Sequence, residues 1–156
     1  MHIHLFAMIE LELPILPCLC SNLRRTTRAL TQLYETALRP VGLRATQFTL
    51  LQALSRTGEI SQNRLGRILV MDSTSLTRTL GIMIRAGWVR ERRGQDRRER
   101  WLSLADEGEQ QLNRALPAWE DVQSRLRGQL GEQAWNGLLQ LTHQVTNVAT
   151  TEGESL

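Results

Sequence analysis

Apolar residues recur every three or four positions along most of the chain, which is the spacing of amphipathic helices. Glycines, prolines and possible capping residues separate the helical runs from one another. The pattern predicts six helices, at about residues 18–38, 46–57, 61–69, 72–87, 106–127 and 132–149. The tail after Ala149 is expected to be frayed.

Side chains that can accept a hydrogen bond from a free backbone N–H precede several of these helices. Thr46 is the expected cap of the second helix, Ser61 of the third and Asp72 of the fourth. Asp106, followed three residues later by Glu109, is expected to form a capping pair at the start of the fifth. These residues mark where the helices begin.

The fourth predicted helix has two chemically different faces. At about 100° per residue, one arc holds Leu76, Leu80, Met83 and Ile84, and the opposite arc holds Thr74, Thr77, Arg78, Gly81 and Arg85. The apolar arc is expected to pack inward, as are Leu65, Ile68 and Leu69 of the third helix. The polar arc is left for a partner. Gly87 is expected to end the helix in the left-handed conformation.

Residues 88–91 and 100–104 are predicted to be two short strands, joined by a polar turn near Gly94 and Asp96. Residues 85–101 contain seven arginines and three acidic residues, a formal charge of +4, whereas the whole chain carries +3. The positive charge is concentrated in one segment, as phosphate binding requires. Trp88 and Trp101 are expected to pack the base of this hairpin against the fourth helix.

The composition indicates one soluble domain. The 156 residues suffice for a domain with an oligomerisation element, and no apolar run reaches the roughly 20 residues of a membrane helix. The first 17 residues lack arginine and lysine and contain Glu10 and Glu12, which argues against a secretory signal. We therefore expect a cytoplasmic protein. All 19 basic side chains are arginines, which suits phosphate contacts and also arises in high-GC genomes.

Three short helices followed by a basic hairpin are the order of elements in a winged helix-turn-helix. The predicted fold class is mainly α with a small β-hairpin wing, added to a helical region for a total of about six helices. In such a fold the second helix of the motif enters the major groove of DNA, and arginines of the wing suit the negative potential of the narrow minor groove.

Four segments carry a resemblance to a known family: Ile60-Ser61-Gln62-Asn63-Arg64-Leu65-Gly66, Asp72-Ser73-Thr74-Ser75-Leu76-Thr77-Arg78, Arg85-Ala86-Gly87-Trp88-Val89-Arg90-Glu91 and Asp96-Arg97-Arg98. The chain closely resembles the MarR family of bacterial transcription regulators, along nearly its whole length after about residue 16. The resemblance implies an N-terminal extension at 1–17, a helical dimerisation region at 18–42 and 106–150, and a winged helix-turn-helix lobe at 43–105.

The resemblance also implies a DNA-binding surface, made by Ser61, Gln62, Ser73, Thr74, Thr77, Arg78, Asp96 and Arg98. In the family, the start of the third helix often meets phosphates and the fourth helix faces the major groove. Asp96 and Arg98 pair or position the wing, and Arg98 reaches into the minor groove. The family commonly has a capping threonine where this chain has Ala105, so Asp106 is expected to take over that cap.

The function implied is that of a homodimeric regulator, expected to be a repressor, on a pseudo-palindromic operator. No cofactor is expected. A small aromatic or phenolic ligand, bound between the dimerisation helices and the DNA-binding lobe, or cysteine oxidation would release the DNA. Two alternatives stay open: a cysteine-based peroxidase-like enzyme, and a winged-helix protein-interaction module that does not bind DNA.

Cys18 and Cys20 are the candidates for a redox sensor. Residues two apart on a helix point about 200° apart, which disfavours a disulfide between them. Cys20 is expected to be a buried thiol, whereas Cys18 lies at the helix start on the side of Arg25, where the helix dipole and positive charge would lower its pKa. His2, His4 and His143 add no second cluster of zinc spacing, so no metal site is expected.

Overall fold

The computed structural model describes residues 14–154 and has a mainly helical fold with one small sheet. Its helices are α1 (Leu19–Leu38), α2 (Ala45–Thr57), α3 (Gln62–Leu69), α4 (Ser73–Arg85), α5 (Asp106–Leu130) and α6 (Glu132–Glu154), with a short 3-10 helix, η1 (Arg39–Val41), after α1. The strands are β1 (Ile60–Ser61), β2 (Val89–Arg93) and β3 (Arg100–Leu104). The predicted fold class is confirmed.

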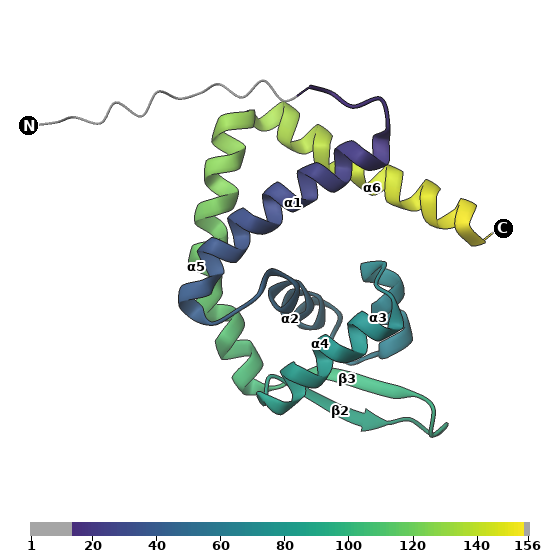
Figure 1. Ribbon diagram of the computed structural model, residues 1–156. Coiled ribbons are helices and arrows are strands. Elements are labelled where there is room, and N and C mark those ends of the chain that lie inside the picture. Colours follow the sequence, from purple (N-terminus) through teal and green to yellow (C-terminus); the bar gives the residue numbers. More distant parts are fainter. Residues whose placement is uncertain (1–13, 155–156) are drawn as a thin grey trace, which may run out of the picture.

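The elements form a compact lobe and a set of long helices (Figure 1). In this view α2, α3, α4 and the sheet lie in the lower part, while α1 and α6 lie above them. The long helix α5 runs along one side from the wing to the start of α6, and it contacts α1, α2 and α6. Within residues 14–154, no helix is long and apolar enough to cross a membrane.

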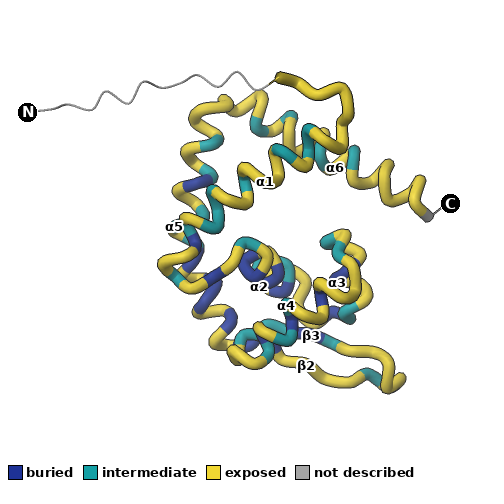
Figure 2. Tube along the Cα trace, in the orientation of Figure 1, coloured by how far each residue is buried: buried dark blue, intermediate teal, exposed yellow. Residues whose placement is uncertain are grey.

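The hydrophobic core lies in the lobe (Figure 2). Its fully buried side chains come from the end of α1, from α2, α3 and α4, and from β3. They include Leu38, Leu50, Leu51, Leu65, Met83 and Leu102. The first half of α5 closes this core with Leu112 and Ala115. The described side chains of α6 are all at least partly exposed. Apolar burial therefore stabilises the lobe more than the outer helices.

The sheet is antiparallel, in the order β1-β3-β2. Val89 pairs with Leu104 and Arg93 with Arg100, while Ile60 pairs with Leu102 on the other edge of β3. Sequence reasoning predicted the β2–β3 hairpin but not β1, because two residues are too few to show a strand period. β1 joins the wing directly to α3, which starts at the next residue.

The predicted caps of α3 and α4 are confirmed. The Ser61 hydroxyl accepts a hydrogen bond from the N–H of Arg64 at 3.3 Å, and a carboxylate oxygen of Asp72 accepts one from the N–H of Ser75 at 2.8 Å. Gly87 adopts the left-handed conformation expected after α4, with φ of 78°. The boundaries of the helix-turn-helix thus follow from local chemistry.

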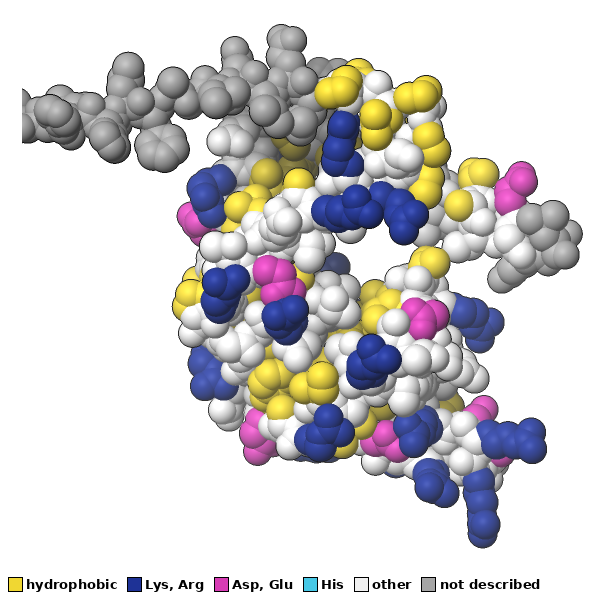
Figure 3. Space-filling model, viewed as in Figure 1, with side chains coloured by type: hydrophobic (Ala, Val, Ile, Leu, Met, Phe, Trp, Pro, Cys, Tyr) yellow, Lys and Arg dark blue, Asp and Glu magenta, His cyan; other side chains and the backbone are white. Residues whose placement is uncertain are grey.

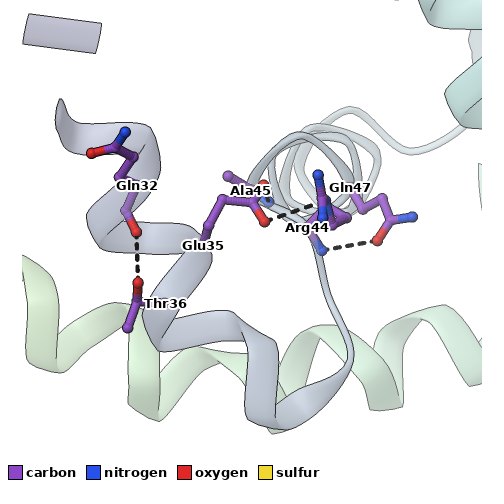
Figure 4. A network of polar contacts seen from close by, with 6 residues as sticks. All are labelled: Gln32, Glu35, Thr36, Arg44, Ala45 and Gln47. Carbon is purple, nitrogen blue, oxygen red and sulfur yellow. Dashed lines mark hydrogen bonds and ion pairs between the residues drawn. The ribbon is translucent and has the colours of Figure 1, made fainter. Parts of the chain in front are cut away.

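The predicted cap of α2 is wrong. α2 begins one residue before Thr46, at Ala45, and its first N–H groups are bonded by side chains from two elements (Figure 4). The N–H of Ala45 donates to Glu35 of α1 at 2.9 Å, and the N–H of Arg44 donates to Gln47 at 2.9 Å. The Arg44 guanidinium also pairs with Glu35 at 3.3 Å. A tertiary contact from Glu35 of α1 and a local contact from Gln47 of α2 therefore cap this helix in place of Thr46.

The predicted cap of α5 is also wrong. Ala105 occupies the cap position, and no side chain of residues 14–154 caps the helix there. Asp106 instead accepts a hydrogen bond from the Arg90 guanidinium at 3.0 Å. The start of α5 is still stabilised by Asp106, Glu107 and Glu109, because negative charges in the first turn interact favourably with the helix dipole.

Three smaller expectations change. Ile68 was expected to face inward but is 52 % exposed. The strand predicted to end at residue 91 continues to Arg93, because its last residues pair with β3. α6 extends through Glu154 rather than fraying after Ala149, and threonines along its last turns return hydrogen bonds to preceding backbone carbonyls. Residues 155 and 156 lie outside the described part of the chain.

Gly108 generates a prediction about stability. A Cβ at Gly108 would overlap the carbonyl oxygen of Trp88 and lie 2.9 Å from Leu104 Cδ1, whereas a Cβ at Gly128, in the same helix, would meet no atom within 4 Å. We expect Gly108→Ala to lower the free energy of unfolding by about 1–3 kcal/mol, because α5 must move away from the wing.

The matched control, Gly128→Ala, is expected to leave the unfolding free energy unchanged or to raise it by up to about 1 kcal/mol. Both values can be measured by urea denaturation. Equal stability of the two variants would contradict the close approach of α5 to Trp88.

Candidate nucleic-acid interface

The exposed face of α4 carries the residues predicted to face DNA. Ser73, Thr74, Thr77 and Arg78 are all exposed, while Leu76 and Leu80 of the same helix are buried in the core. Packing of the apolar arc thus fixes which side chains α4 presents to solvent. The face contains hydroxyl groups and one guanidinium, which can bond phosphates or base edges.

The start of α3 lies against α4 through one side-chain hydrogen bond. The Gln62 amide nitrogen donates to the Thr77 hydroxyl oxygen at 2.9 Å. The Thr77 hydroxyl therefore keeps its own proton to donate elsewhere. Ser61 is half-buried and its hydroxyl already caps α3, so it is less available than Gln62 to an outside partner.

The wing turn is organised by Asp96. A carboxylate oxygen of Asp96 accepts a hydrogen bond from the backbone N–H of Arg98 at 2.9 Å, and the Asp96 carbonyl accepts one from Glu99 at 2.9 Å. Gly94 closes the turn by donating to the Glu99 carbonyl at 2.9 Å. Asp96 therefore positions the turn through the backbone of Arg98 and leaves the Arg98 guanidinium exposed.

The arginines of the wing fall into two groups. Arg90, Arg92 and Arg100 are paired with Asp106, Glu59 and Glu91, respectively. Among the residues described, the guanidinium groups of Arg93, Arg97 and Arg98 have no ion-pair partner. Figure 3 shows arginine side chains projecting from this part of the lobe. Uncompensated positive charge is thus concentrated at the wing tip, which the sequence alone could not show.

The two tryptophans of the wing differ in their surroundings. Trp88 is half-buried and packs against the core of the lobe, as predicted. Trp101 lies apart from that core: its ring is 5.2 Å from the Arg92 guanidinium, and its indole N–H donates to Glu99 at 3.4 Å. The expectation that Trp101 packs against α4, the predicted recognition helix, is therefore wrong.

Both cysteines are exposed and neither forms a disulfide with the other, so the expectation that Cys20 is buried is wrong. Cys20 lines an open groove between α1 and α6, beside Leu19 and Leu23. Cys18 immediately precedes α1, and the pKa of its thiol is lowered by hydrogen bonding from the Ser21 hydroxyl and then from the Ser21 backbone N–H. Arg25, expected to contribute, instead bonds the Pro14 carbonyl at 2.7 Å.

A cavity of about 290 Å³ lies between α1, α2 and α5. Its eleven lining residues are all uncharged, and they include Tyr34, Phe48 and Trp119. The Gln123 amide nitrogen donates to the Tyr34 hydroxyl oxygen at 2.8 Å. Burial raises the pKa of Tyr34, which keeps its hydroxyl protonated and able to donate a hydrogen bond. This partly open pocket has room for a small aromatic molecule.

Within residues 14–154, no group of three or more His, Cys, Asp or Glu side chains could hold a metal ion. His2 and His4, the other histidines considered with the cysteines, lie outside the described residues.

Comparison with known proteins agrees with this geometry. Residues 41–99 match the model of the MarR family. The transcriptional regulator MosR of M. tuberculosis, in a crystal structure with DNA, is 33% identical, with a TM-score of 0.78 over 86% of this chain and 97% of MosR. The chain belongs to the MarR family. Members of this family are transcriptional regulators and not enzymes, which removes the peroxidase-like alternative.

Two further proteins are similar to this chain, one in sequence and one in fold. The HTH-type transcriptional regulator YwoH of Bacillus subtilis, itself uncharacterised, is 29% identical over 91 residues, which are 58% of this chain and 66% of YwoH. A mutant of E. coli MarR, complexed with operator DNA, has a TM-score of 0.73 at 22% identity, over 81% of this chain and 92% of that protein.

The chemistry at Cys18 leads to a prediction. Since the thiolate is the reactive form and the pKa of Cys18 is lowered, iodoacetamide should alkylate Cys18 faster than Cys20 near pH 7. Ser21→Ala should slow alkylation of Cys18 and leave Cys20 unchanged. Mass spectrometry of the peptides would measure both rates, and equal rates at pH 7 would contradict the prediction.

Proposed function

We propose that this MarR-family regulator is a DNA-binding repressor that acts as a homodimer on a pseudo-palindromic operator. The observation that carries the proposal is the pairing, in one lobe, of an exposed hydroxyl-rich face on α4 with a wing tip whose arginines form no ion pair within residues 14–154. The DNA complex of MosR, a relative at 33% identity, supports the same partner for this chain.

Each predicted DNA-binding residue has a role in this proposal. Thr77 and Arg78, with Ser73 and Thr74, face the major groove, and Gln62 holds the Thr77 hydroxyl. Arg98 enters the minor groove while Asp96 holds its backbone. Ser61 acts mainly as the cap of α3. In this proposal α4 lies in the major groove and the wing tip in the minor groove.

Homodimerisation would use the outer helices, residues 18–42 and 106–150, with 1–17 as an extension to this region. The exposed apolar side chains there include Leu19, Leu138, Leu139, Leu141 and Val148. Leucine and valine in such number on a helical surface are characteristic of an interface. Two lobes held about 34 Å apart would reach successive major grooves. A protein with this function would act in the cytoplasm.

Release of DNA would follow from a change in the distance between the two lobes. We infer two triggers. A small aromatic ligand in the cavity at Tyr34 would alter the packing of α1, α2 and α5. Oxidation of Cys18 would change the start of α1: its thiolate would attack a hydroperoxide oxygen, break the O–O bond and become a sulfenic acid, while the other oxygen leaves with a proton as an alcohol or as water.

Arg98 provides a test of the DNA contact of the wing. The wild-type protein is expected to protect a site in its own upstream DNA from nuclease cleavage. Arg98→Ala should weaken binding across operator variants and lower the magnitude of the slope of log K against log salt by roughly one, because one phosphate-bound cation is lost. Fluorescence anisotropy with labelled operator DNA measures both quantities.

Arg39→Ala, which removes the same charge from η1, is the matched control and should leave the slope unchanged. An unaltered slope in Arg98→Ala would remove Arg98 from phosphate contact. Failure of the wild-type protein to bind the upstream DNA at low salt would favour the protein-interaction module instead.

A second prediction concerns the charge of the ligand. The cavity has no basic lining residue, and the Glu35 carboxylate bonds the N–H of Ala45 at its wall. Burying an unpaired carboxylate is costly, so benzamide or phenol should bind at least about tenfold more tightly than benzoate. Isothermal titration calorimetry would compare them. Tyr34→Phe should weaken benzamide binding by removing a donor, and equal affinity for benzoate would exclude a neutral-ligand site.

A further inference from the structure

Glu59 is an acidic residue in a lobe that, under the proposed function, must approach a polyanion. It lies just before β1, and its carboxylate accepts two hydrogen bonds from the Arg92 guanidinium of β2, one of them from Nε at 2.7 Å. These hydrogen bonds lower the pKa of Glu59 and raise that of Arg92, so both groups stay charged. The pair is the only bidentate one among the ion pairs of residues 14–154.

The pair crosses the whole sheet. In the strand register Ser61 of β1 lies beside Trp101 of β3, and Trp101 lies beside Arg92 of β2. The Arg92 guanidinium sits 5.2 Å from the centre of the Trp101 ring and reaches past it to Glu59. Glu59, Arg92 and Trp101, which we call the wing clamp, therefore tie the outer strand β2 to β1 across the central strand.

The wing clamp is connected to α4 through the start of α3. Glu59 is separated by Ile60 and Ser61 from Gln62, the first residue of α3. Ile60 is buried in the core and Ser61 caps α3, so this short stretch is held at both residues. Gln62 then bonds Thr77 on the exposed face of α4. A continuous series of contacts thus runs from the strand that carries the wing tip to the face of α4.

We propose that Glu59 is a positioning residue for DNA binding, which holds the wing at a fixed angle to the recognition helix through the wing clamp. This inference rests on the proposed function. It also assigns Arg92 to the wing itself rather than to phosphate, because its guanidinium is committed to Glu59 and to the Trp101 ring. The DNA contacts of the wing then fall to the tip arginines Arg93, Arg97 and Arg98.

The test is the direction of the change in affinity. If Glu59 only repels DNA, Glu59→Gln removes a negative charge, frees Arg92 for phosphate, and therefore strengthens operator binding and steepens its salt dependence. The wing clamp predicts the opposite. Glu59→Gln should weaken binding about fivefold, the size expected from an exposed ion pair together with a cation–π contact, without a steeper salt dependence.

Arg92 provides the second half of the test. Arg92→Ala should weaken binding to a similar degree with an unchanged salt slope, and the double variant Glu59→Gln/Arg92→Ala should be no weaker than either single variant. Additive losses, or a slope lowered by about one in Arg92→Ala, would assign Arg92 to phosphate and overturn the clamp.

The matched control is Glu91→Gln, which removes the same charge from β2 but breaks only the 3.6 Å pair with Arg100 on the adjacent strand. It should bind operator DNA as well as the wild type or better. A measurement without DNA completes the test: amide hydrogen exchange at residues 93–99 should be faster in Glu59→Gln than in Glu91→Gln. Equal exchange would overturn the clamp, whereas a wild type that binds no DNA would overturn only the proposed function.

Discussion

The contact between the start of α5 and the segment that joins α4 to β2 is the constraint on which the arrangement of the molecule depends. The Trp88 carbonyl accepts a hydrogen bond from the N–H of Ala105 at 2.9 Å, and Gly108 lies against the same carbonyl because it has no side chain. Trp88 leads into β2, Ala105 ends the hairpin, and α5 continues to the outer helices. One small contact therefore joins the recognition helix, the wing and the helix that leaves the lobe.

Ion pairing decides how the positive charge of the wing is used. A hairpin with seven nearby arginines would attract any polyanion, yet three of these arginines are satisfied by carboxylates from β2, α5 and the segment before β1. Exposed pairs of this kind add little to stability. Their consequence is geometric, since they orient the strands and leave the uncompensated charge at the tip, where shape rather than total charge can discriminate among DNA sites.

The candidate sensor sites lie away from the recognition helix but on elements that reach it. The cavity at Tyr34 is lined by α1, α2 and α5, and α2 and α5 both pack on the core beneath α4. Cys18 lies at the other end of α1. Under the proposed function, a change at either place would act through packed helices, which have few intermediate arrangements, and would alter the spacing of the two lobes of the dimer.

Much of the fold follows from local sequence. Hydrophobic spacing defines six helices, Ser61 and Asp72 cap α3 and α4 through side chains three residues away, and Gly87 supplies a conformation that other residues avoid. The exposed face of α4 and the turn at Asp96 follow in the same way, because the atoms involved are near neighbours along the chain.

The remaining features depend on residues that only folding brings together. Glu35 caps α2 from ten residues away, Glu59 meets Arg92 across 33 residues, and Gln123 meets Tyr34 across 89. No helical or strand period reports such pairs, and for the same reason the burial expected for Cys20 and Ile68 was wrong. Local sequence predicts the six helices, the β2–β3 hairpin and the polar face of α4. Which charges remain free depends on the tertiary structure, because neutralisation depends on distance in space.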